Sequence, residues 1–384
     1  MAVFSGFLIG ALSGLLPGLH SNTIASLAAA GSPDASFLSF FIMAVFASHI
    51  AFSFFPAIFI GAPDENTVQS VLPGHRLMRE GKGLVALLHV CACLCIAAML
   101  SLLLFPLALQ LMPLIYSAIS PHMLLFLLAA SAFLLISERS IGKIAKASLV
   151  FLLCGFLGSL TMQTGMREPL FCVFSGLFAV SGLISSQGSS EKIPTQQPPA
   201  LSFSSWKYVL VGIALGMLSD LFPGIAAPAQ IAVFASFFIK IEDAMHYLAL
   251  VSSIAASHAV FALSAAIGFG KAREGSLAIV QQTAGISMQN AGALLGTFAL
   301  CLGLSALLIV LLLRFAHKID FNIFSRLRIP IVMYLFAVSF ILDGALGVFV
   351  LALSSLLGTL PLLLGVRRTH VMGCIIVPSM LLLA

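Results

Sequence analysis

The stretch LSGLLPGLH at Leu12–His20 lies inside a long hydrophobic segment and returns in altered form as LSDLFPGIA at Leu218–Ala226. Proline has no backbone N–H and glycine is flexible, so each Pro-Gly pair predicts a break in its helix. Backbone groups freed by a break within lipid are tolerated only where protein or water covers them. Two breaks at matching places in two halves of a chain are typical of a solute site at the midplane of a transporter.

The composition identifies an integral membrane protein. Hydrophobic residues make up 60% of the chain and charged residues only 8%, whereas a soluble domain carries about 25% charged residues. Apolar runs of more than about 18 residues favour membrane helices over the alternating strands of a barrel. We therefore expect an all-α polytopic protein of about 10–12 transmembrane helices in the plasma membrane. Met1–Leu16 lacks a basic n-region, so no cleavable signal peptide is expected.

Charge and motifs argue against other classes of function. The net charge of +5 is attributed to cytoplasmic loops, because no Lys/Arg run is dense enough to bind nucleic acid. The seven cysteines lie in apolar stretches and are interpreted as packing residues. The patterns GxxxxGK[ST], HExxH and GxSxG do not occur in the sequence. We therefore expect a protein that is not an enzyme and has no cofactor.

The chain divides into two halves that resemble each other. Polar residues 185–205 are interpreted as an extramembrane linker between a first repeat, residues 1–184, and a second repeat, residues 206–384. Gly10–Gly18 matches Gly216–Gly224 at six of nine positions. Further along, Ala47-Ser48-His49 matches Ala256-Ser257-His258, Glu65 matches Glu274 and Thr67 matches Ser276. Ordered matches of this kind indicate a duplicated architecture. Parallel and inverted repeats both remain open, since the broken segments could cross the membrane or return within it.

The first broken segment carries polar residues after its Pro17-Gly18 pair. Ser, Asn and Thr are favoured at the start of a helix, and Ser21, Asn22 and Thr23 follow His20 directly. A helix that begins here offers free N–H groups and a positive dipole end, which suit a carboxylate. The same hydroxyl, amide and carbonyl oxygens are also suited to a sodium ion. The alternative is a capped kink that satisfies its own backbone.

The second broken segment differs from the first in its polar residues. Asp220 is flanked by apolar residues, and an ionisable group within a span is by default a cation or proton site, or is paired. The Pro223-Gly224 pair follows it, and Gln230 is the polar side chain beyond the break. The two segments would therefore hold a solute asymmetrically.

Several further residues are candidates for a transport pathway. An imidazole within the membrane can relay protons, although it can also be a hydrogen-bonded packing residue. Asp343 lies at a possible helix junction, with an interfacial loop as the alternative. The candidates for the pathway are Ser48, His49, Glu65, Thr67, Ser257, His258 and Asp343.

Taken together, these motifs resemble the large membrane subunit of the tripartite tricarboxylate transporter family, in a short, archaeal-type form. The resemblance is carried by GALSGLLPGLHSNT and its echo GMLSDLFPGIAAPAQ, by GAPDENTVQSVLPGHRLMREGKG after the second span, and by GLFAVSGLI at Gly176–Ile184. It implies cation-coupled uptake of carboxylates, together with a small membrane subunit and a solute-binding protein. The chain departs from the longer bacterial pattern by its length and by Ala226-Ala227-Pro228, which replaces a polar cluster.

The sequence therefore predicts a secondary active transporter that moves a small organic anion, a di- or tricarboxylate, driven by a Na+ or H+ gradient. The alternatives are a membrane-embedded enzyme that uses Asp220, Asp343, His49 and His258, and a non-catalytic membrane subunit of a larger complex.

Overall fold

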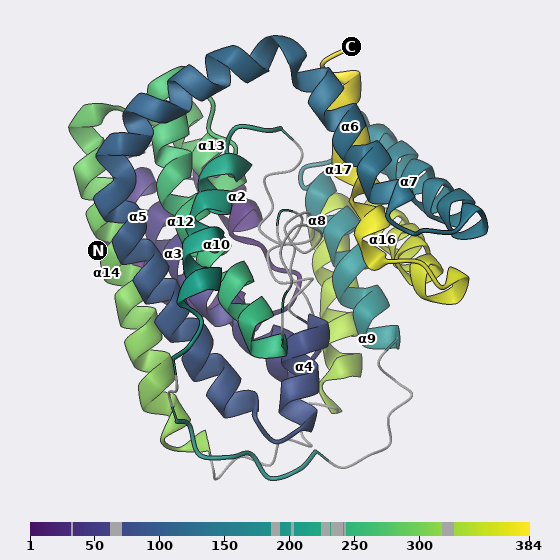
Figure 1. Ribbon diagram of the computed structural model, residues 1–384, viewed down its shortest axis with the longest axis horizontal. Helices are drawn as coiled ribbons and strands as arrows, with labels where there is room; N and C mark the ends of the chain where they lie inside the picture. Colours follow the sequence, from purple (N-terminus) through teal and green to yellow (C-terminus); the bar gives the residue numbers. More distant parts are fainter. Residues whose placement is uncertain are drawn as a thin grey trace. The chain divides into compact units, whose positions relative to one another are not determined.

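The computed structural model describes residues 1–31, 34–61, 71–185, 193–200, 203–223, 231, 241, 243–316 and 326–384. These residues form helices and no strand (Figure 1). Six of the described helices are long and apolar enough to cross a membrane. The chain is thus an all-α polytopic membrane protein, as its composition predicts. Two compact units are present: a first unit of Met1–Ser117, Glu191–Leu221 and Ala226–Ser325, and a second unit of the remaining segments. Each unit contains segments from both predicted repeats.

The predicted helix breaks are confirmed as far as the structure describes them. α1 (Ala2–Leu15) ends before Pro17, and α2 (Ser21–Gly31) begins a new helix beyond it. Gly18 sits between them with φ +85°, a left-handed conformation that only glycine adopts without strain. In the second half, α10 (Trp206–Ser219) ends at its C-cap residue Asp220, just before Pro223. Both helices stop because a proline lies a few residues ahead.

Two long helices form the buried centre of the first unit. These are α3 (Ala35–Phe59) and α12 (Ala244–Phe269), which are hydrophobic and buried along most of their length. α1 packs along α3, and α10 packs along α12. Glycines make these contacts close: a Cβ added to Gly10 would lie 2.8 Å from Val45 Cα, and one added to Gly216 would lie 2.9 Å from the His258 backbone nitrogen. Small residues at helix crossings are typical of membrane proteins, where packing drives association.

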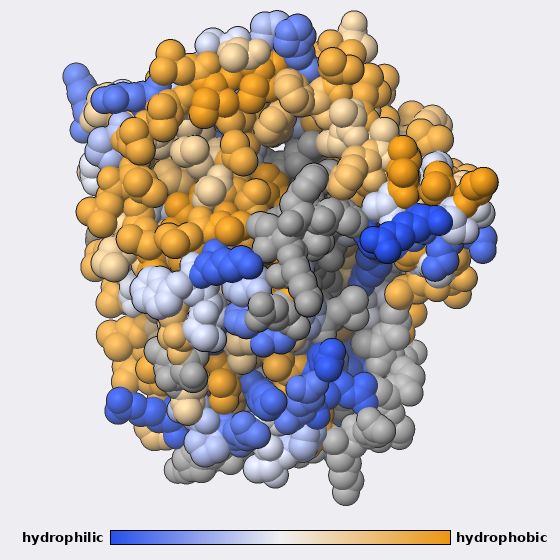
Figure 2. Space-filling model, in the orientation of Figure 1, coloured by the Kyte–Doolittle hydropathy of each residue, from blue (hydrophilic) through white to orange (hydrophobic). Residues whose placement is uncertain are grey.

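The rest of the first unit surrounds this centre. It consists of α4 (Val71–Arg79), α5 (Gly83–Ile119), α13 (Gly275–Thr283) and α14 (Met288–Leu313). α14 and the short α13 pack on α3, and α4 contacts both α3 and α12. Figure 2 shows hydrophobic residues over the upper part of α5. Leu103 and Leu114 on this helix are 72% and 67% exposed, which is the surface expected to face lipid.

The predicted linker is attached to the first unit by hydrogen bonds. Gln196 is buried, accepts a hydrogen bond from Gly83 N (2.8 Å) and donates one to Met78 O (3.0 Å). The backbone N–H of Gln197 donates to Gly81 O at 2.7 Å. The segment therefore holds the turn between α4 and α5, and it serves as more than a flexible spacer between the halves.

Replacing Gln196 by alanine is expected to lower stability by about 1–3 kcal/mol, because it leaves a buried N–H and a buried carbonyl without their partner. Thermal unfolding of the purified protein in detergent measures this loss. The control is Gln197→Ala, since the exposed Gln197 side chain is removed while its backbone bond stays. Equal unfolding temperatures for the two variants would contradict this role of Gln196.

The second unit is built around α7 (Ile141–Thr161) and α16 (Arg328–Leu364). α17 (Gly373–Leu381) packs along α7, and the π-helix η2 (Ser175–Val180) packs along α16. The other elements are η1 (Ser120–His122), α6 (Met123–Ile136), α8 (Pro169–Phe174), α9 (Ser181–Ser185) and η5 (Arg368–Met372). Glycines again sit at the crossings: a Cβ on Gly176 would lie 2.6 Å from Leu351 O.

Two carboxylates in the second unit bind backbone groups of the opposite half of the chain. Asp343 accepts hydrogen bonds from Arg167 N (2.6 Å) and Glu168 N (3.3 Å). Glu138 accepts from Arg367 N (2.9 Å) and lies 2.8 Å from His370 Nε2. Burial raises the pKa of the Glu138 carboxyl, but these hydrogen bonds outweigh it and hold that pKa below its usual value. Each half of the chain therefore supplies a carboxylate that holds backbone N–H groups of the other half in place.

In two places, neighbouring hydrophobic runs of the sequence belong to one continuous helical stretch. The runs at residues 84–112 and 122–137 lie in a stretch in which α5 runs through η1 into α6. The runs at residues 329–342 and 345–364 form the single helix α16, which is kinked at Gly344 (φ 62°, ψ −147°). In both places a gap in hydrophobicity marks a kink or a helical turn.

Candidate functional site

Each half of the chain holds a buried serine–histidine pair where a broken helix packs on a central helix. In the first half, Ser13 Oγ on α1 lies 3.0 Å from His49 Nδ1 on α3. In the second half, Ser219 Oγ on α10 lies 3.0 Å from His258 Nδ1 on α12. Ser13 and Ser219 correspond in the repeat, and so do His49 and His258. The sequence match thus extends to side-chain geometry.

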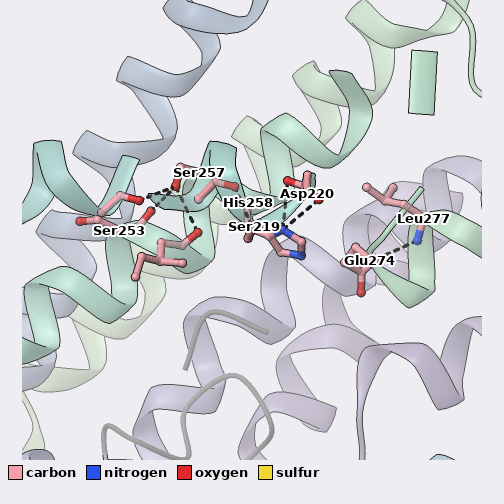
Figure 3. Close-up of polar contacts among 10 residues, drawn as sticks. Ser219, Asp220, Ser253, Ser257, His258, Glu274 and Leu277 are labelled. Atoms are coloured by element: carbon pink, nitrogen blue, oxygen red, sulfur yellow. Dashed lines mark hydrogen bonds and ion pairs between the residues drawn. The ribbon is translucent and has the colours of Figure 1, made fainter. Parts of the chain in front are cut away.

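The second pair includes a carboxylate. Both oxygens of Asp220 lie 3.1 Å from His258 Nδ1, and Asp220 is 0% exposed. Figure 3 shows Ser219 and Asp220 converging on the imidazole ring of His258. Gly14 occupies the matching position in the first half, where an added Cβ would lie 2.7 Å from Phe52 Cβ and 2.8 Å from His49 O. The first half therefore has no room for a carboxylate at this position.

The short helix α13 connects this group to the first broken segment. Glu274 caps α13 by accepting a hydrogen bond from Leu277 N at 2.8 Å, and its carboxyl lies within electrostatic range of the His258 imidazole. One turn along, Ser276 Oγ donates to Asn22 Oδ1 on α2 at 2.9 Å. Gly275 lies against the Asn22 amide, because an added Cβ would be 2.7 Å from Asn22 Cγ. The N-terminal ends of α2 and α13 therefore meet at Asn22 and Ser276.

A guanidinium group lies next to Glu274 in the chain. Arg273 is partly buried, its Nη2 lies 3.5 Å from the Tyr116 hydroxyl, and its charge interacts with that of Asp220. Tyr116 stacks in turn on Phe269, with ring centroids 4.1 Å apart. The cluster formed by Asp220, His258, Arg273 and Glu274 thus contains groups of both signs. We refer to it as the charged cluster.

The residues around the first Pro-Gly break, which the sequence predicts as part of the site, are largely buried. Pro17, Gly18, His20, Ser21 and Thr23 are all buried, and His20 O accepts a hydrogen bond from Ile24 N at the start of α2. Positive helix ends of this kind attract carboxylates.

The remaining predicted residues lie in several places. Ser48 and Ser257 are fully buried, and Ser257 Oγ donates to backbone carbonyls, among them Ser253 O at 2.7 Å. Pro223 is partly exposed. Asp343 belongs to the second unit, where it binds backbone N–H groups. Four predicted residues, Glu65, Thr67, Gly224 and Gln230, lie outside the described residues. Within the described ranges, no group of three or more His, Cys, Asp or Glu side chains is arranged to hold a metal ion.

The site contains residues that the sequence did not single out: Ser13, Ser219, Arg273, Glu274, Gly275 and Ser276. A signal for some of them was present, because Glu274 and Ser276 are the repeat partners of the predicted Glu65 and Thr67. Ser13 and Ser219 also lie within the duplicated motif that precedes each Pro-Gly pair.

Comparisons with known proteins agree with the resemblance found in the sequence. The chain is 25% identical over 341 residues to an uncharacterized protein from Methanocaldococcus jannaschii, a match that covers 83% of this chain and 82% of that protein. No solved structure matches it. The model of the tripartite tricarboxylate transporter TctA family matches residues 1–373. The chain therefore belongs to the tripartite tricarboxylate transporter TctA family.

Proposed function

We propose that this protein is a secondary active transporter of the plasma membrane that carries a di- or tricarboxylate, driven by a cation gradient. The observation that supports this most is the meeting of two helix N-termini at Asn22 and Ser276, beside the charged cluster. Each helix end carries a partial positive charge. Because Glu274 already caps the α13 end, the start of α2 is the end that suits a carboxylate of the solute.

The roles of the candidate residues follow from this arrangement. Ser21, Asn22 and Thr23 at the start of α2 would donate hydrogen bonds to the solute or coordinate the coupling cation. Asp220 would serve the cation rather than the anion, because it is itself negative. Gly224 and Gln230 complete the predicted set from the second broken segment. Neither catalysis nor a cofactor is needed for this function, which a cation gradient would power.

The two halves are proposed to be duplicated repeats, and each compact unit contains segments from both of them. The Ser13–His49 and Ser219–His258 pairs, which occupy matching positions in the two halves, support this view. Membership of a tripartite family also suggests partners, namely a small membrane subunit and a solute-binding protein that delivers the anion.

Asn22→Ala is expected to raise the KM for citrate uptake by about 10- to 150-fold, because a hydrogen bond to a charged ligand contributes about 1.5–3 kcal/mol. The matched control is Ser276→Ala, which removes the same contact between α2 and α13 but keeps the Asn22 amide. Equal effects of the two variants would show that Asn22 only positions α13 and does not bind the solute.

Uptake by proteoliposomes tests the function itself. The purified protein is reconstituted and supplied with labelled citrate or succinate, with an imposed Na+ or pH gradient and with no gradient. We expect gradient-dependent accumulation, and exchange of labelled for unlabelled anion without a gradient. Folded protein that supports neither accumulation nor exchange of any carboxylate, with or without its partner subunits, would refute the proposal.

A further inference from the structure

We propose that the coupling ion is a proton and that the Asp220–His258 pair is the site that carries it. This inference rests on the proposed function and goes beyond it, because it names the ion and the residues that hold it. It starts from the geometry of one imidazole nitrogen.

His258 Nδ1 faces three oxygens at once. Ser219 Oγ lies at 3.0 Å and both Asp220 oxygens lie at 3.1 Å. A neutral imidazole carries one N–H, and the negative carboxylate is the strongest acceptor available to it. With Nδ1–H donating to Asp220, the nitrogen Nε2 is the basic atom of the ring. A further proton added there converts the pair into a carboxylate–imidazolium pair.

The same geometry argues against sodium at this position. A sodium ion needs several oxygen ligands, and carboxylates are among the best of them. Asp220 Oδ2 is bound by an N–H donor, whose positive hydrogen repels a cation, while Oδ1 lies 3.1 Å from the same nitrogen and forms no hydrogen bond within the described part of the chain. Asp220 is also 0% exposed, so a sodium ion could reach it only if the surrounding side chains moved.

The ionisable surroundings of the pair determine what a proton does there. Other titratable or charged side chains lie on α10 and α12 and on the elements around them. Among the described residues these are His49, His75, Arg76, Arg79, His89, Cys91, Cys93, Cys95, Tyr116, Lys207, Tyr208, His246, Tyr247, Arg273, Glu274 and Cys301. Among these, Arg273 interacts electrostatically with Asp220, and Glu274 interacts with His258.

Besides His258 the cluster contains two acids and one guanidinium, so with both acids ionised its charges balance only when a proton is bound. In that state Asp220 and Glu274 contribute two negative charges, and Arg273 contributes one positive charge. With neutral His258 the net charge is −1, and with protonated His258 it is zero. A net negative charge in a poorly hydrated site opposes an incoming anion, since charge interactions there are only weakly screened. Proton binding removes this opposition.

Proton and anion would therefore promote each other's binding. Coupling of this kind is reciprocal, so bound anion also favours the protonated cluster. A carrier that is stable either with neither ligand or with proton and anion both bound transports the two species together. At the position that matches Asp220 the first half has Gly14, so the Ser13–His49 pair receives no carboxylate from that position. The structure thus assigns one coupling proton to this cluster.

The test begins with wild-type protein in sodium-free proteoliposomes and labelled citrate. An inward proton gradient is expected to drive accumulation, by about tenfold per pH unit for each proton carried. A pH-indicator dye in weakly buffered detergent solution is expected to report proton uptake when citrate binds. Exchange of labelled for unlabelled citrate without any gradient is measured in parallel.

Asp220→Asn is the informative variant, because it keeps the shape of the side chain and removes its charge. It is expected to abolish both the accumulation driven by the pH gradient and the dye signal. Ser253→Ala on the same helix is the control, since Ser253 is buried in α12 without touching the cluster. Its accumulation and dye signal should match those of the wild type.

The outcomes separate this inference from the proposed function. Exchange of citrate together with accumulation driven only by sodium overturns the proton site but leaves the transporter intact. So does Asp220→Asn protein that accumulates citrate in a pH gradient as the wild type does. If Asp220→Asn does not fold, the wild-type dye signal decides, and citrate binding without proton uptake overturns the site. Absence of exchange and of all accumulation refutes the transporter itself.

Discussion

Replacing Gly216 by valine is expected to prevent α10 from packing on α12 and to leave little folded protein. A Cβ at this position would collide with Ser257 Oγ and lie 2.9 Å from His258 N and 3.0 Å from Ile254 O. Two of these atoms belong to the backbone of a buried helix and cannot turn aside. Overpacking costs about 1–3 kcal/mol where side chains can adjust, and we expect at least about 3 kcal/mol here.

Gly303→Val is the matched control for this experiment. Gly303 lies within α14, and an added Cβ there would meet nothing within 4 Å. Both variants introduce the same β-branched side chain into a helix, so they differ only in the space available. Thermal stability in detergent, followed by size-exclusion chromatography, should fall sharply for Gly216→Val alone. Similar stability of the two variants would mean that α10 and α12 are not in this close contact.

Asp343→Ala is expected to destabilise the second unit by about 2–4 kcal/mol, because hydrogen bonds to charged groups contribute about 1.5–3 kcal/mol each. Its two oxygens accept from the backbone N–H groups of Arg167 and Glu168. Asp343→Asn keeps one acceptor oxygen and should restore part of the stability. Thermal unfolding of both variants measures these differences.

The same two variants decide between two roles for Asp343. The sequence predicts a pathway residue, while its hydrogen bonds indicate that it orders the segment before α8. A structural role requires that uptake follow the amount of folded protein in both variants. Asp343→Asn protein that is as stable as the wild type but does not accumulate citrate would contradict that role and favour the pathway.

Local backbone chemistry was predictable from the sequence. The Pro-Gly pairs determine where α1 and α10 end, because proline excludes the preceding residues from a regular helix. Hydrophobicity located the apolar helices, but it did not show that α5 continues into α6 or that α16 is a single kinked helix. The prolines at 106 and 113 do not interrupt α5, since membrane helices tolerate proline when neighbours satisfy the freed carbonyls.

The sequence did not predict which helices pack against one another. A soluble helix reveals its buried face through the spacing of its apolar residues, but α3 and α12 are hydrophobic all round. The contact between Asn22 and Ser276 joins residues 254 positions apart, and no local pattern specifies it. For this reason Glu274 and Arg273 were missed, although the repeat alignment contained Glu274.

The hydrogen bonds that Asp343 and Glu138 form with the opposite half of the chain have a consequence for how the protein is made. Glu138 finds its backbone partner Arg367 229 residues later in the chain. At roughly 5–20 residues per second, the ribosome needs about 10–45 s to synthesise this interval. During that time Glu138 has been released from the ribosome but lacks Arg367. Nascent chains that stop short of Arg367 lack the backbone partner of Glu138, so this link between the two halves forms only when the chain is nearly complete.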